Sequence, residues 1–424
     1  MGSENLFNRQ ELEQVFTIST KTVNPNIHAK QKYKHFSIPA FDELKTPIIE
    51  VGEQIKSNKY LLERDSILVS KLNPRIKRVW QYKYSQEEAI PVCSTEFIVY
   101  QPKTKIVNME FYFHYFNSEI FQEYLLGLQS GTTGSRMRVT PKATFKLKIP
   151  IPTINEQQKI ASILSSVDEL IEKTEAVIGQ TERVKRGVMQ KLLIKGIGHT
   201  KFKKTEFGEI PKMWESVKFE TLFKIKHGYA FKSEFFKDEG KYILLTPGNF
   251  EASGGLKLKG NKEKYYIGEV PQEYILNKDD LLVVLTDLTK ECKILGSPAF
   301  IKEDNYFLHN QRLGKIIELD EEKINKRYLF HLFNSSLYRQ HLKNTATGTT
   351  VRHTSPDRIC EVTVPLPLLE EQEKIDSILS TVESKLKIEN KKLFTLKQLK
   401  KGLMQSLLTG QVRVKVDEDE VTQA

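Results

Sequence analysis

The sequence predicts an α+β protein that consists of two copies of one unit, each a mixed α/β globular part followed by a long helix. Residues Pro150–Val167 and Pro365–Val382 are identical at 11 of 18 positions, and both segments have the apolar spacing of an amphipathic helix. Further upstream, the motif Phe113–Ser118 is repeated at Phe330–Ser335. We therefore expect two mixed α/β domains in a pseudo-twofold repeat, separated by two long helices that form an antiparallel coiled coil.

The repeat divides the chain into five segments. Gly187 and Gly402 occupy corresponding places near the ends of the two helical segments, so the copies stay in step along their length. The expected segments are a first globular domain over residues 1–150, a central helix over 151–197, a second globular domain over 198–364, a C-terminal helix over 365–412 and a tail over 413–424.

The two helical segments are expected to pair through an apolar seam. Thr153 and Glu156 form the pattern of a capping box at the start of the first helix, whereas the second has Leu368 in place of the threonine. Each helix spans about 38 residues, or roughly 57 Å. Apolar residues recur in alternating steps of three and four, which is typical of a coiled coil. The expected seam is Ile160, Ile163, Val167, Leu170, Val177, Val184 and Val188, with Thr174 and Thr181 in the stripe, and Ile375, Leu379, Val382, Leu386, Leu393, Leu396, Leu399, Leu403 and Leu407, interrupted by Glu389.

Short strands and one helix are predicted in each globular part. Apolar and β-branched runs lie between Gly, Pro, Asn and Asp turns, which is the pattern of half-buried or buried strands. The runs are Ser66–Val69, Phe97–Tyr100, Tyr242–Leu245 and Leu281–Leu285. A helix is expected at about Met109–Leu126 in the first part and at about Arg327–Lys343 in the second.

The positive charge belongs to the globular parts. The chain has a formal net charge of +11, of which +6 falls in residues 1–150 and +4 in residues 198–364. The helical segments 151–197 and 365–424 carry only +1 and 0. Two basic modules joined by neutral helices suit binding to a polyanion at two places, although an excess of lysine is also common in proteins that bind no nucleic acid.

The composition is that of a soluble protein, with 39% hydrophobic residues and no run long enough to cross a membrane. The polar start of the chain does not resemble a signal peptide, so we expect a cytoplasmic protein with no membrane partner. Cys93, Cys292 and Cys360 form no CxxC pair, and we interpret them as buried thiols.

Signatures of catalysis are scarce. The sequence has neither a phosphate-binding P-loop nor a dinucleotide-binding Gly-x-Gly-x-x-Gly motif. Asp280 with Glu291 and Lys293 has the loose spacing of a metal-dependent nuclease, but the first copy has no matching Glu-x-Lys. A solvated charged loop is the simpler interpretation. No catalytic residue and no metal ligand is therefore predicted.

The candidate binding residues lie mainly in two loops, one before each helical segment. Glycine, threonine and arginine occur together at Gly131–Arg138 and again from Gly348, and such groups suit phosphate oxygens and the guanine edge. The alternative is an ordinary turn. Two basic stretches are further candidates, with solvated lysines over core aromatics as the alternative. The expected DNA-binding residues are Lys71, Arg75, Lys77, Arg78, Thr132, Thr133, Arg136, Arg138 and Lys142 in the first copy, and Lys226, His227, Tyr229, Lys232, Thr349, Thr350, Arg352, His353 and Arg358 in the second.

These residues resemble the specificity subunit of type I restriction-modification systems. The resemblance rests on the Pro-x-Pro-x-x-x-Glu-Gln-x-Lys-Ile pattern at Pro150 and Pro365 and on the Gly-x-Met-Gln-x-Leu-Leu pattern at Gly187 and Gly402. The opening segment Thr205–Glu215 of the second globular part adds to it. It covers essentially the whole chain, but the first half lacks the Gly-x-Ile-Pro-x-x-Trp motif of that opening segment.

The resemblance implies a division of labour. Each globular part would be a target-recognition domain that reads one half of a bipartite site in double-stranded DNA. The helices would set the spacing and dock two modification (methyltransferase) subunits, and restriction (translocase and nuclease) subunits would complete the complex. The chain itself would carry no active site and no cofactor, because S-adenosylmethionine, ATP and magnesium would belong to the partner subunits.

Two other classes of function remain open from the residues alone. One is a DNA-modifying enzyme that acts by itself, which would bind S-adenosylmethionine or cut DNA with magnesium. The other is a coiled-coil scaffold without DNA specificity, whose globular parts would have no affinity for DNA.

Overall fold

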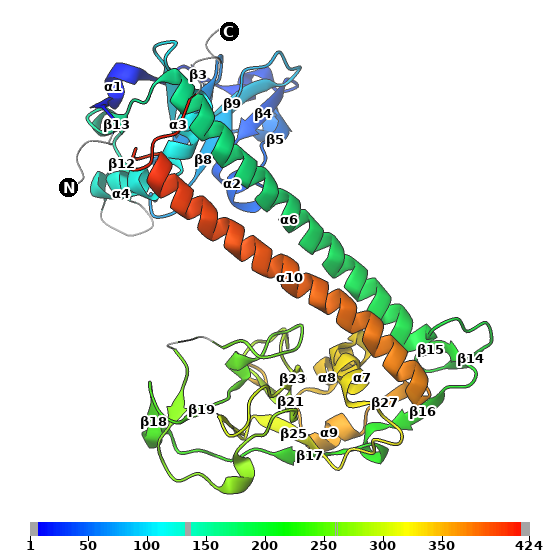
Figure 1. The fold of residues 1–424 in the computed structure, drawn as a ribbon. Helices are drawn as coiled ribbons and strands as arrows, with labels where there is room; N and C mark the ends of the chain where they lie inside the picture. Colours follow the sequence, from blue (N-terminus) through cyan, green and yellow to red (C-terminus); the bar gives the residue numbers. More distant parts are fainter. Residues whose placement is uncertain (1–6, 132–136, 259, 261, 417–424) are drawn as a thin grey trace. The chain divides into compact units, whose positions relative to one another are not determined.

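The computed structural model describes residues 7–131, 137–258, 260 and 262–416 (Figure 1). It divides into two compact units, Met1–Ala176 with Lys391–Ala424, and Val177–Asn390. Each unit therefore contains one globular domain and part of each long helix. In the described part of the chain, no helix is long and apolar enough to cross a membrane.

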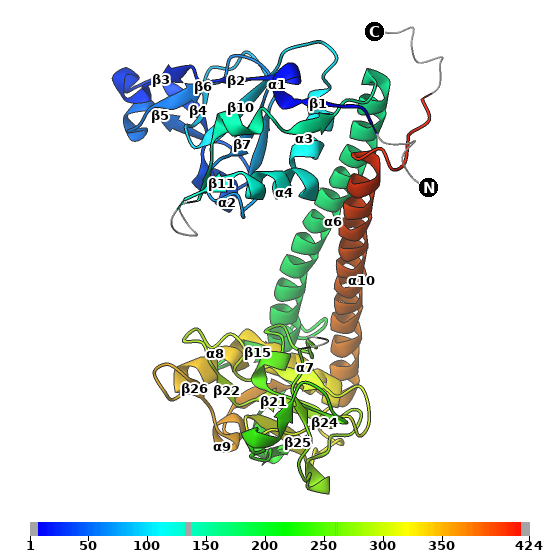
Figure 2. The ribbon, with the colours of Figure 1, turned by 90° about the vertical axis from the view of Figure 1, so that its left-hand side faces the viewer.

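Two larger sheets form most of the first domain, beside the two-stranded pairs β1-β13 and β11-β12. A four-stranded antiparallel sheet has the order β2-β10-β7-β8, and a five-stranded sheet has the order β3-β6-β9-β4-β5, in which β4 and β9 are parallel (Figure 2). Side chains of α3 pack on the face of β7 and β10 in the largest core of this unit. The elements are β1 (Arg9–Glu11), α1 (Leu12–Val15), β2 (Phe16–Ser19), β3 (Thr22–Val23), β4 (Lys32–Phe36), α2 (Ile38–Glu43), β5 (Ile48–Val51), β6 (Lys59–Leu61), β7 (Ser66–Ser70), β8 (Val79–Tyr82), β9 (Ile90–Ser94), β10 (Phe97–Pro102), α3 (Met109–Phe116), α4 (Glu119–Gly127), β11 (Gln129–Ser130), β12 (Arg138–Val139), α5 (Pro141–Thr144) and β13 (Lys148–Pro150).

The second domain repeats the four-stranded sheet. Its order is β17-β25-β21-β23, and α7 packs on it as α3 does in the first domain. Another four-stranded sheet, β18-β20-β19-β24, contains the parallel pair β19 and β24. The elements are β14 (Phe202–Thr205), β15 (Gly208–Pro211), β16 (Glu215–Lys218), β17 (Lys224–His227), β18 (Phe236–Lys237), β19 (Tyr242–Leu244), β20 (Tyr265–Tyr266), β21 (Leu281–Val284), β22 (Thr286–Asp287), β23 (Pro298–Phe300), β24 (Phe307–Leu308), β25 (Leu313–Ile317), α7 (Lys326–Asn334), α8 (Ser336–Thr345), β26 (Arg352–His353), α9 (Pro356–Cys360) and β27 (Thr363–Leu366).

The single helix predicted in each domain is wrong in one respect, because the structure has two helices in each place. The Ser118 side chain accepts a hydrogen bond from Phe121 N and caps α4. Ser335 caps α8 in the same way through Tyr338 N. A side-chain acceptor at this position starts a new helix. The repeated motif ending in Asn-Ser is thus a helix end followed by a helix cap.

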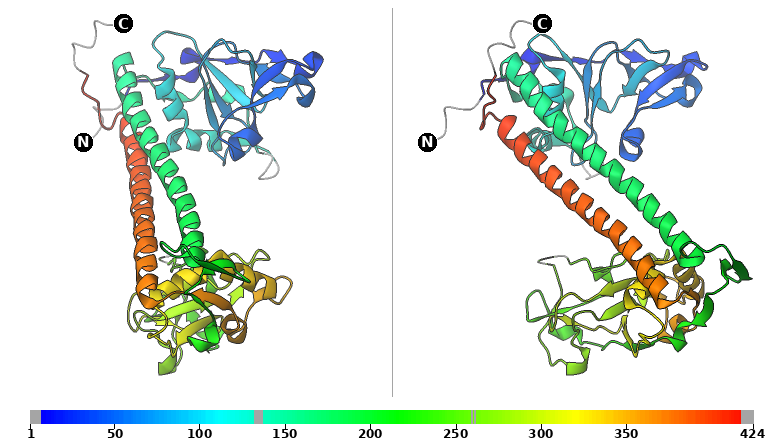
Figure 3. Two further views of the ribbon diagram at one scale, coloured as in Figure 1. Left: turned by 90° about the vertical axis from the view of Figure 1, so that its right-hand side faces the viewer. Right: turned by 45° about the vertical axis from the view of Figure 1, so that its right-hand side comes forward.

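The two long helices are α6 (Ile154–Lys195), with 42 residues, and α10 (Leu369–Leu407), with 39 residues. The predicted capping box is present, since Thr153 N donates to Glu156 Oε2 and Glu156 N donates to Thr153 Oγ1. In the first unit Glu175 pairs with Lys397, and Asp168 with Lys400. Residue numbers fall along α10 as they rise along α6, so the helices run antiparallel there (Figure 3). The predicted fold class, two mixed α/β domains with packed long helices, is confirmed.

A buried glutamine attaches each helix to its own domain. The Gln157 side chain donates to Ile106 O and Pro152 O and accepts from Asn108 N. The second copy repeats these bonds, as the Gln372 side chain donates to Lys323 O and Pro367 O and accepts from Asn325 N. Both glutamines are fully buried. These bonds satisfy backbone groups that would otherwise be buried without a partner.

The seam of α10 largely follows the prediction, but the seam predicted for α6 is partly wrong. Leu170 and Val184 are 46% and 49% exposed, whereas Thr174 and Thr181 are 3% and 9% exposed. The hydroxyls of both threonines donate to carbonyl oxygens one turn earlier, which allows their burial. On α10, Leu399 is 49% exposed. The buried or half-buried line on α6 runs through residues 160, 164, 167, 171, 174, 178, 181, 185, 188 and 192.

The glutamate at the start of each long helix has different partners in the two units, which fits the absence of the tryptophan motif from the first half. In the second unit, Trp214 Nε1 and His199 Nε2 both donate to Glu371 at the start of α10. In the first unit the corresponding Glu156 binds Arg413, whose guanidinium lies 4.9 Å from the centre of the Phe7 ring. The ion pair of Arg413 with Glu156 thus takes the place of the tryptophan hydrogen bond, and the Phe7 ring packs against its guanidinium.

Candidate DNA-recognition surface

Two predicted segments of the first domain, far apart in the sequence, lie side by side. The loop from β7 to β8 contacts the strand β12, because Val139 N donates to Lys71 O and Asn73 N donates to Met137 O. A bridge between Leu72 and Arg138 extends the pairing. The basic stretch Lys71 to Arg78 and the end of the glycine-rich loop therefore form one surface. Thr132, Thr133 and Arg136 lie outside the described residues.

The cations of this surface differ in what they contact. Arg78 is 7% exposed and forms two hydrogen bonds with Asp42, which hold the pKa of that carboxyl below its usual value. Arg138 pairs with Glu96, and Lys77 Nζ donates to Asn117 O at 2.8 Å. Arg75 and Lys142 are exposed. Arg78 therefore supports the loop, whereas Arg75 and Lys142 are available to a partner.

A narrow hairpin carries the equivalent residues in the second domain. Thr347 and His353 exchange backbone hydrogen bonds, and β26 pairs with β22 so that His353 faces Thr286. His353 Nδ1 lies 3.1 Å from Thr286 Oγ1. Thr349 and Thr350 are exposed at the tip of this hairpin. The hairpin thus presents threonine hydroxyls and a histidine ring.

The arginines of this hairpin bind its own backbone. Arg352 donates to Gly348 O and Lys343 O, and Arg358 donates to Thr345 O and to the Thr347 hydroxyl. Gly348 has a φ of 91°, a left-handed conformation that favours glycine. In these positions the guanidinium groups fix the shape of the hairpin.

The remaining predicted residues lie on and after β17. Lys226 pairs with Glu273 and lies 4.6 Å from the centre of the Tyr274 ring. Tyr229 packs against Phe231 and Tyr274, while His227 and Lys232 are exposed. β17 is an edge strand on the far side of its sheet from β23. His227 and Val283 both pair with Gly314 of β25, so β17 and β21 end at the same edge of the sheet with one strand between them.

Residues 288–293 of the second domain, where the sequence indicates a solvated charged loop at Glu291 and Lys293, are not among the predicted DNA-binding residues. Asp287, fully buried at its root, accepts hydrogen bonds from the amides of Thr289, Ile294 and Leu295. Leu288 is 63% exposed, and Lys290, Glu291 and Lys293 are exposed around the buried Cys292. The loop follows β21 just as the loop Lys71 to Arg78 follows β7. Alignment of the two copies through these strands would have found it.

The nuclease-like pattern is not assembled. Asp280 Oδ2 lies 2.7 Å from Lys315 Nζ and accepts from Asn277 N, whereas Glu291 is exposed in the loop that Asp287 fixes. Among the described residues, no three His, Cys, Asp or Glu side chains are placed to hold a metal ion.

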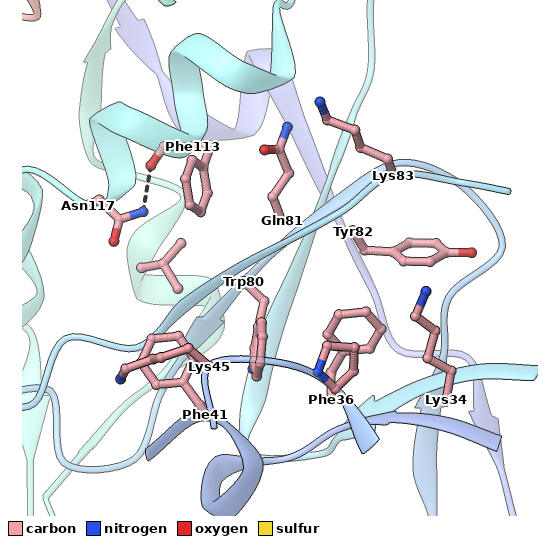
Figure 4. A pocket seen from close by; sticks show the side chains of 12 residues that line it. Lys34, Phe36, Phe41, Lys45, Trp80, Gln81, Tyr82, Lys83, Phe113 and Asn117 are labelled. Carbon is pink, nitrogen blue, oxygen red and sulfur yellow. Dashed lines mark hydrogen bonds between the residues drawn. The ribbon is translucent and has the colours of Figure 1, made fainter. Parts of the chain in front are cut away.

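A hollow of about 610 Å³ lies beside β8 in the first domain (Figure 4). Trp80 lies between the edges of Phe36 and Phe41, with ring centres 5.3 and 5.0 Å away. Lys34 pairs with Glu87 at its border. Phe36 and Phe41 thus each pack edge to face with Trp80.

The two domains carry related loop surfaces, and comparison with known proteins identifies the family. Residues 6–182 and 211–398 match the type I restriction modification DNA specificity domain, well over half of the chain. The chain belongs to this family. It is a DNA specificity subunit of a type I restriction-modification system, and such subunits are non-catalytic and typically free of cofactors.

Named relatives agree with this assignment. The chain is 31% identical over 331 residues to the type I restriction enzyme MjaVIII specificity subunit of Methanocaldococcus jannaschii. The aligned residues make up 76% of this chain and 75% of the relative. It is 30% identical over 217 residues to the EcoBI specificity subunit of Escherichia coli, which covers 49% of this chain and 41% of the relative.

Two solved structures share the fold. The S subunit of a type I system from M. genitalium has a TM-score of 0.58 at 15% identity, with 96% of this chain and 97% of that chain covered. A chain from a study of assembly and conformational transition of the type I system has a TM-score of 0.56 at 17% identity, with 97% and 100% covered. At these identities the likeness concerns the fold alone.

Proposed function

We propose that each globular domain of this specificity subunit reads one half of a bipartite site in double-stranded DNA. The observation that carries the proposal is the repeated loop surface. In the first domain, the loop after β7 lies against β12, the strand that precedes α5. In the second domain, the segment after β21 lies against β26, the strand that precedes α9. Two copies of one binding surface on one chain suit two separate half-sites.

The charge distribution supports this reading. Net charges of +6 and +4 fall in the two globular segments 1–150 and 198–364, which we propose as the limits of the recognition domains. Basic side chains contribute phosphate contacts that position a protein on DNA, and base-edge contacts then specify the sequence. Arg75 and Lys290 are exposed candidates for either role.

The helices α6 and α10 would fix the distance between the half-sites and dock two modification subunits. S-adenosylmethionine would bind to those subunits, and ATP and magnesium would serve restriction subunits if the system includes them. A chain that modifies DNA by itself would need a cofactor or metal site of its own. A scaffold without specificity would leave the methylated sequence unchanged when its loops are altered.

The test is methylome sequencing of cells that carry this chain with its modification subunits. Arg75→Ala should weaken or relax recognition in one half of the methylated motif, and Lys290→Ala in the other half. Each lost base contact costs about 1 to 3 kcal/mol, whereas a lost phosphate contact weakens all sites alike.

Each variant serves as the control for the other, because they lie in different units. Equal effects on both halves of the motif from either substitution would contradict the proposed division between the domains. A methylome that does not depend on the chain at all would contradict the recognition function.

A further inference from the structure

Two lysines occupy positions in the apolar seam of the long helices. Lys185 of α6 and Lys400 of α10 fall in the alternating steps of three and four that the seam residues follow. They correspond to each other in the repeat, 215 residues apart. Their side chains are only 16% and 26% exposed. A charged group at a seam position costs stability unless it is paired, and polar seam residues commonly specify the register of a coiled coil.

In the first unit, Lys400 joins a cluster with a buried histidine. Its ammonium group pairs with Asp168 of α6. The other oxygen of that carboxylate lies 3.8 Å from Nδ1 of His114, which projects from α3 and is 2% exposed. His114 Nε2 donates to the Ser165 hydroxyl, which in turn donates to Glu110. The cluster therefore connects α3 of the globular domain with both long helices.

The second unit contains the same cluster. Lys185 Nζ lies 2.9 Å from Glu383 Oε1 of α10, and that oxygen lies 3.7 Å from His331 Nδ1. His331 projects from α7, is 1% exposed, and donates through Nε2 to Asp376, which also accepts from Ser380. As in the first unit, a histidine of the globular domain lies near a carboxylate of one long helix, and that carboxylate pairs with a lysine of the other.

The lysine of each cluster comes from the other copy of the repeat. His114 on α3 and Asp168 on α6 belong to the first copy, and His331 on α7 and Glu383 on α10 belong to the second. Lys400 lies on α10 and Lys185 on α6, so each lysine comes from the long helix of the other copy. The arrangement forms only when the two helices lie in one register. A shift of either helix by one turn, about 5.4 Å, would separate each lysine from its carboxylate and leave partly buried charges unpaired.

We propose that these two clusters are positioning sites that fix the register of α6 against α10 and seat each recognition domain on the helix pair, so that the unread spacer between half-sites has one length. The lysine and carboxylate set the register, and the histidine transmits it to the domain. This inference rests on the proposed bipartite recognition.

The test compares charge reversal with charge exchange in the full chain, assembled with its modification subunits. Lys400→Glu places two acidic groups together, and we expect a loss of about tenfold in methylation at the native spacer length, with new motifs whose spacers are longer or shorter. A tenfold change corresponds to a loss of about 1.4 kcal/mol. Adding Asp168→Lys restores an opposite pair at the same place and should recover a single spacer length.

The matched control is Lys397→Glu, on the same helix. Lys397 pairs with Glu175 of α6, but both side chains are about half exposed, at 53% and 48%. Exposed pairs contribute little, so this variant should keep the native rate and spacer.

A single sharp spacer at the native rate in Lys400→Glu would overturn the inference, as would a double variant no better than the single one. If Lys400→Glu is not recovered in the complex, Lys400→Met, which removes the charge without reversing it, is measured instead, and a single sharp spacer at the native rate in that variant overturns the inference. A wild-type chain that directs no bipartite methylation would instead contradict the proposed function.

Discussion

Several cationic residues that stand out in the sequence shape the loops of this protein. Arg352 and Arg358 donate to carbonyl oxygens of their own hairpin, and Arg78 is bound by Asp42. A guanidinium beside a glycine-rich turn has the same sequence pattern whether it binds a phosphate or a carbonyl, because both offer oxygen acceptors. The sequence could therefore place the candidate surface but not the role of each arginine.

His114 gives a prediction about pH. Burial lowers its pKa to about 4, with opposing effects from Asp168 and Glu110 and an added lowering by Lys400. Between pH 6.5 and pH 4 the unfolded chain binds a proton at this residue that the folded chain excludes, so stability is full above pH 6.5 and falls on acidification. The loss is about 2 kcal/mol at pH 5.

Replacement of the ring by His114→Gln should remove that part of the acid sensitivity. The free energy of unfolding, measured at pH 7 and pH 5, should differ less in the variant than in the wild type. The control variant is His28→Gln, because His28 is exposed. Its free energy of unfolding should differ between pH 7 and pH 5 as much as that of the wild type. An unchanged pH dependence in His114→Gln would mean that the ring is not buried in the neutral form.

At the scale of elements, the apolar runs of the sequence located the central strands and both long helices. Runs at Ser66–Val69 and Leu281–Leu285 became β7 and β21, since a short buried strand needs little beyond consecutive apolar residues. The seam of α6 was harder to predict because Thr174, Thr181 and Lys185 fill seam positions. Their burial depends on partners that no local pattern shows.

The corrected seam predicts different costs at two neighbouring positions. Ile171 is 9% exposed and Leu170 is 46% exposed. Ile171→Ala should lower the free energy of unfolding by about 2 to 4 kcal/mol through lost packing. Leu170→Ala, the matched control, should cost less than about 1 kcal/mol. The measurement is thermal or denaturant unfolding of the two variants. A larger loss in Leu170→Ala than in Ile171→Ala would show that Leu170, and not Ile171, lies in the seam.

At the scale of the whole molecule, duplication is the property that the sequence displayed most fully. Matching helix starts, matching caps and matching glutamine bonds all follow from one repeat. The specific contacts diverge, as the loop 288–293 and the pair of Phe7 with Arg413 illustrate. Each copy therefore keeps its glutamine bonds to the helix but differs in the contacts at the helix start and in its exposed loops, as expected of two domains that read different half-sites.

We propose that two recognition domains read two half-sites whose spacing the helices set. Seven residues inserted after Thr174 and seven after Glu389 preserve the seam. They also leave the pair of Lys400 with Asp168 and the pair of Lys185 with Glu383 intact. Each helix then grows by roughly 10 Å, which corresponds to about three base pairs. Methylome sequencing should find both half-site sequences unchanged and the spacer about three base pairs longer. An active complex that methylates at the original spacing would contradict the account.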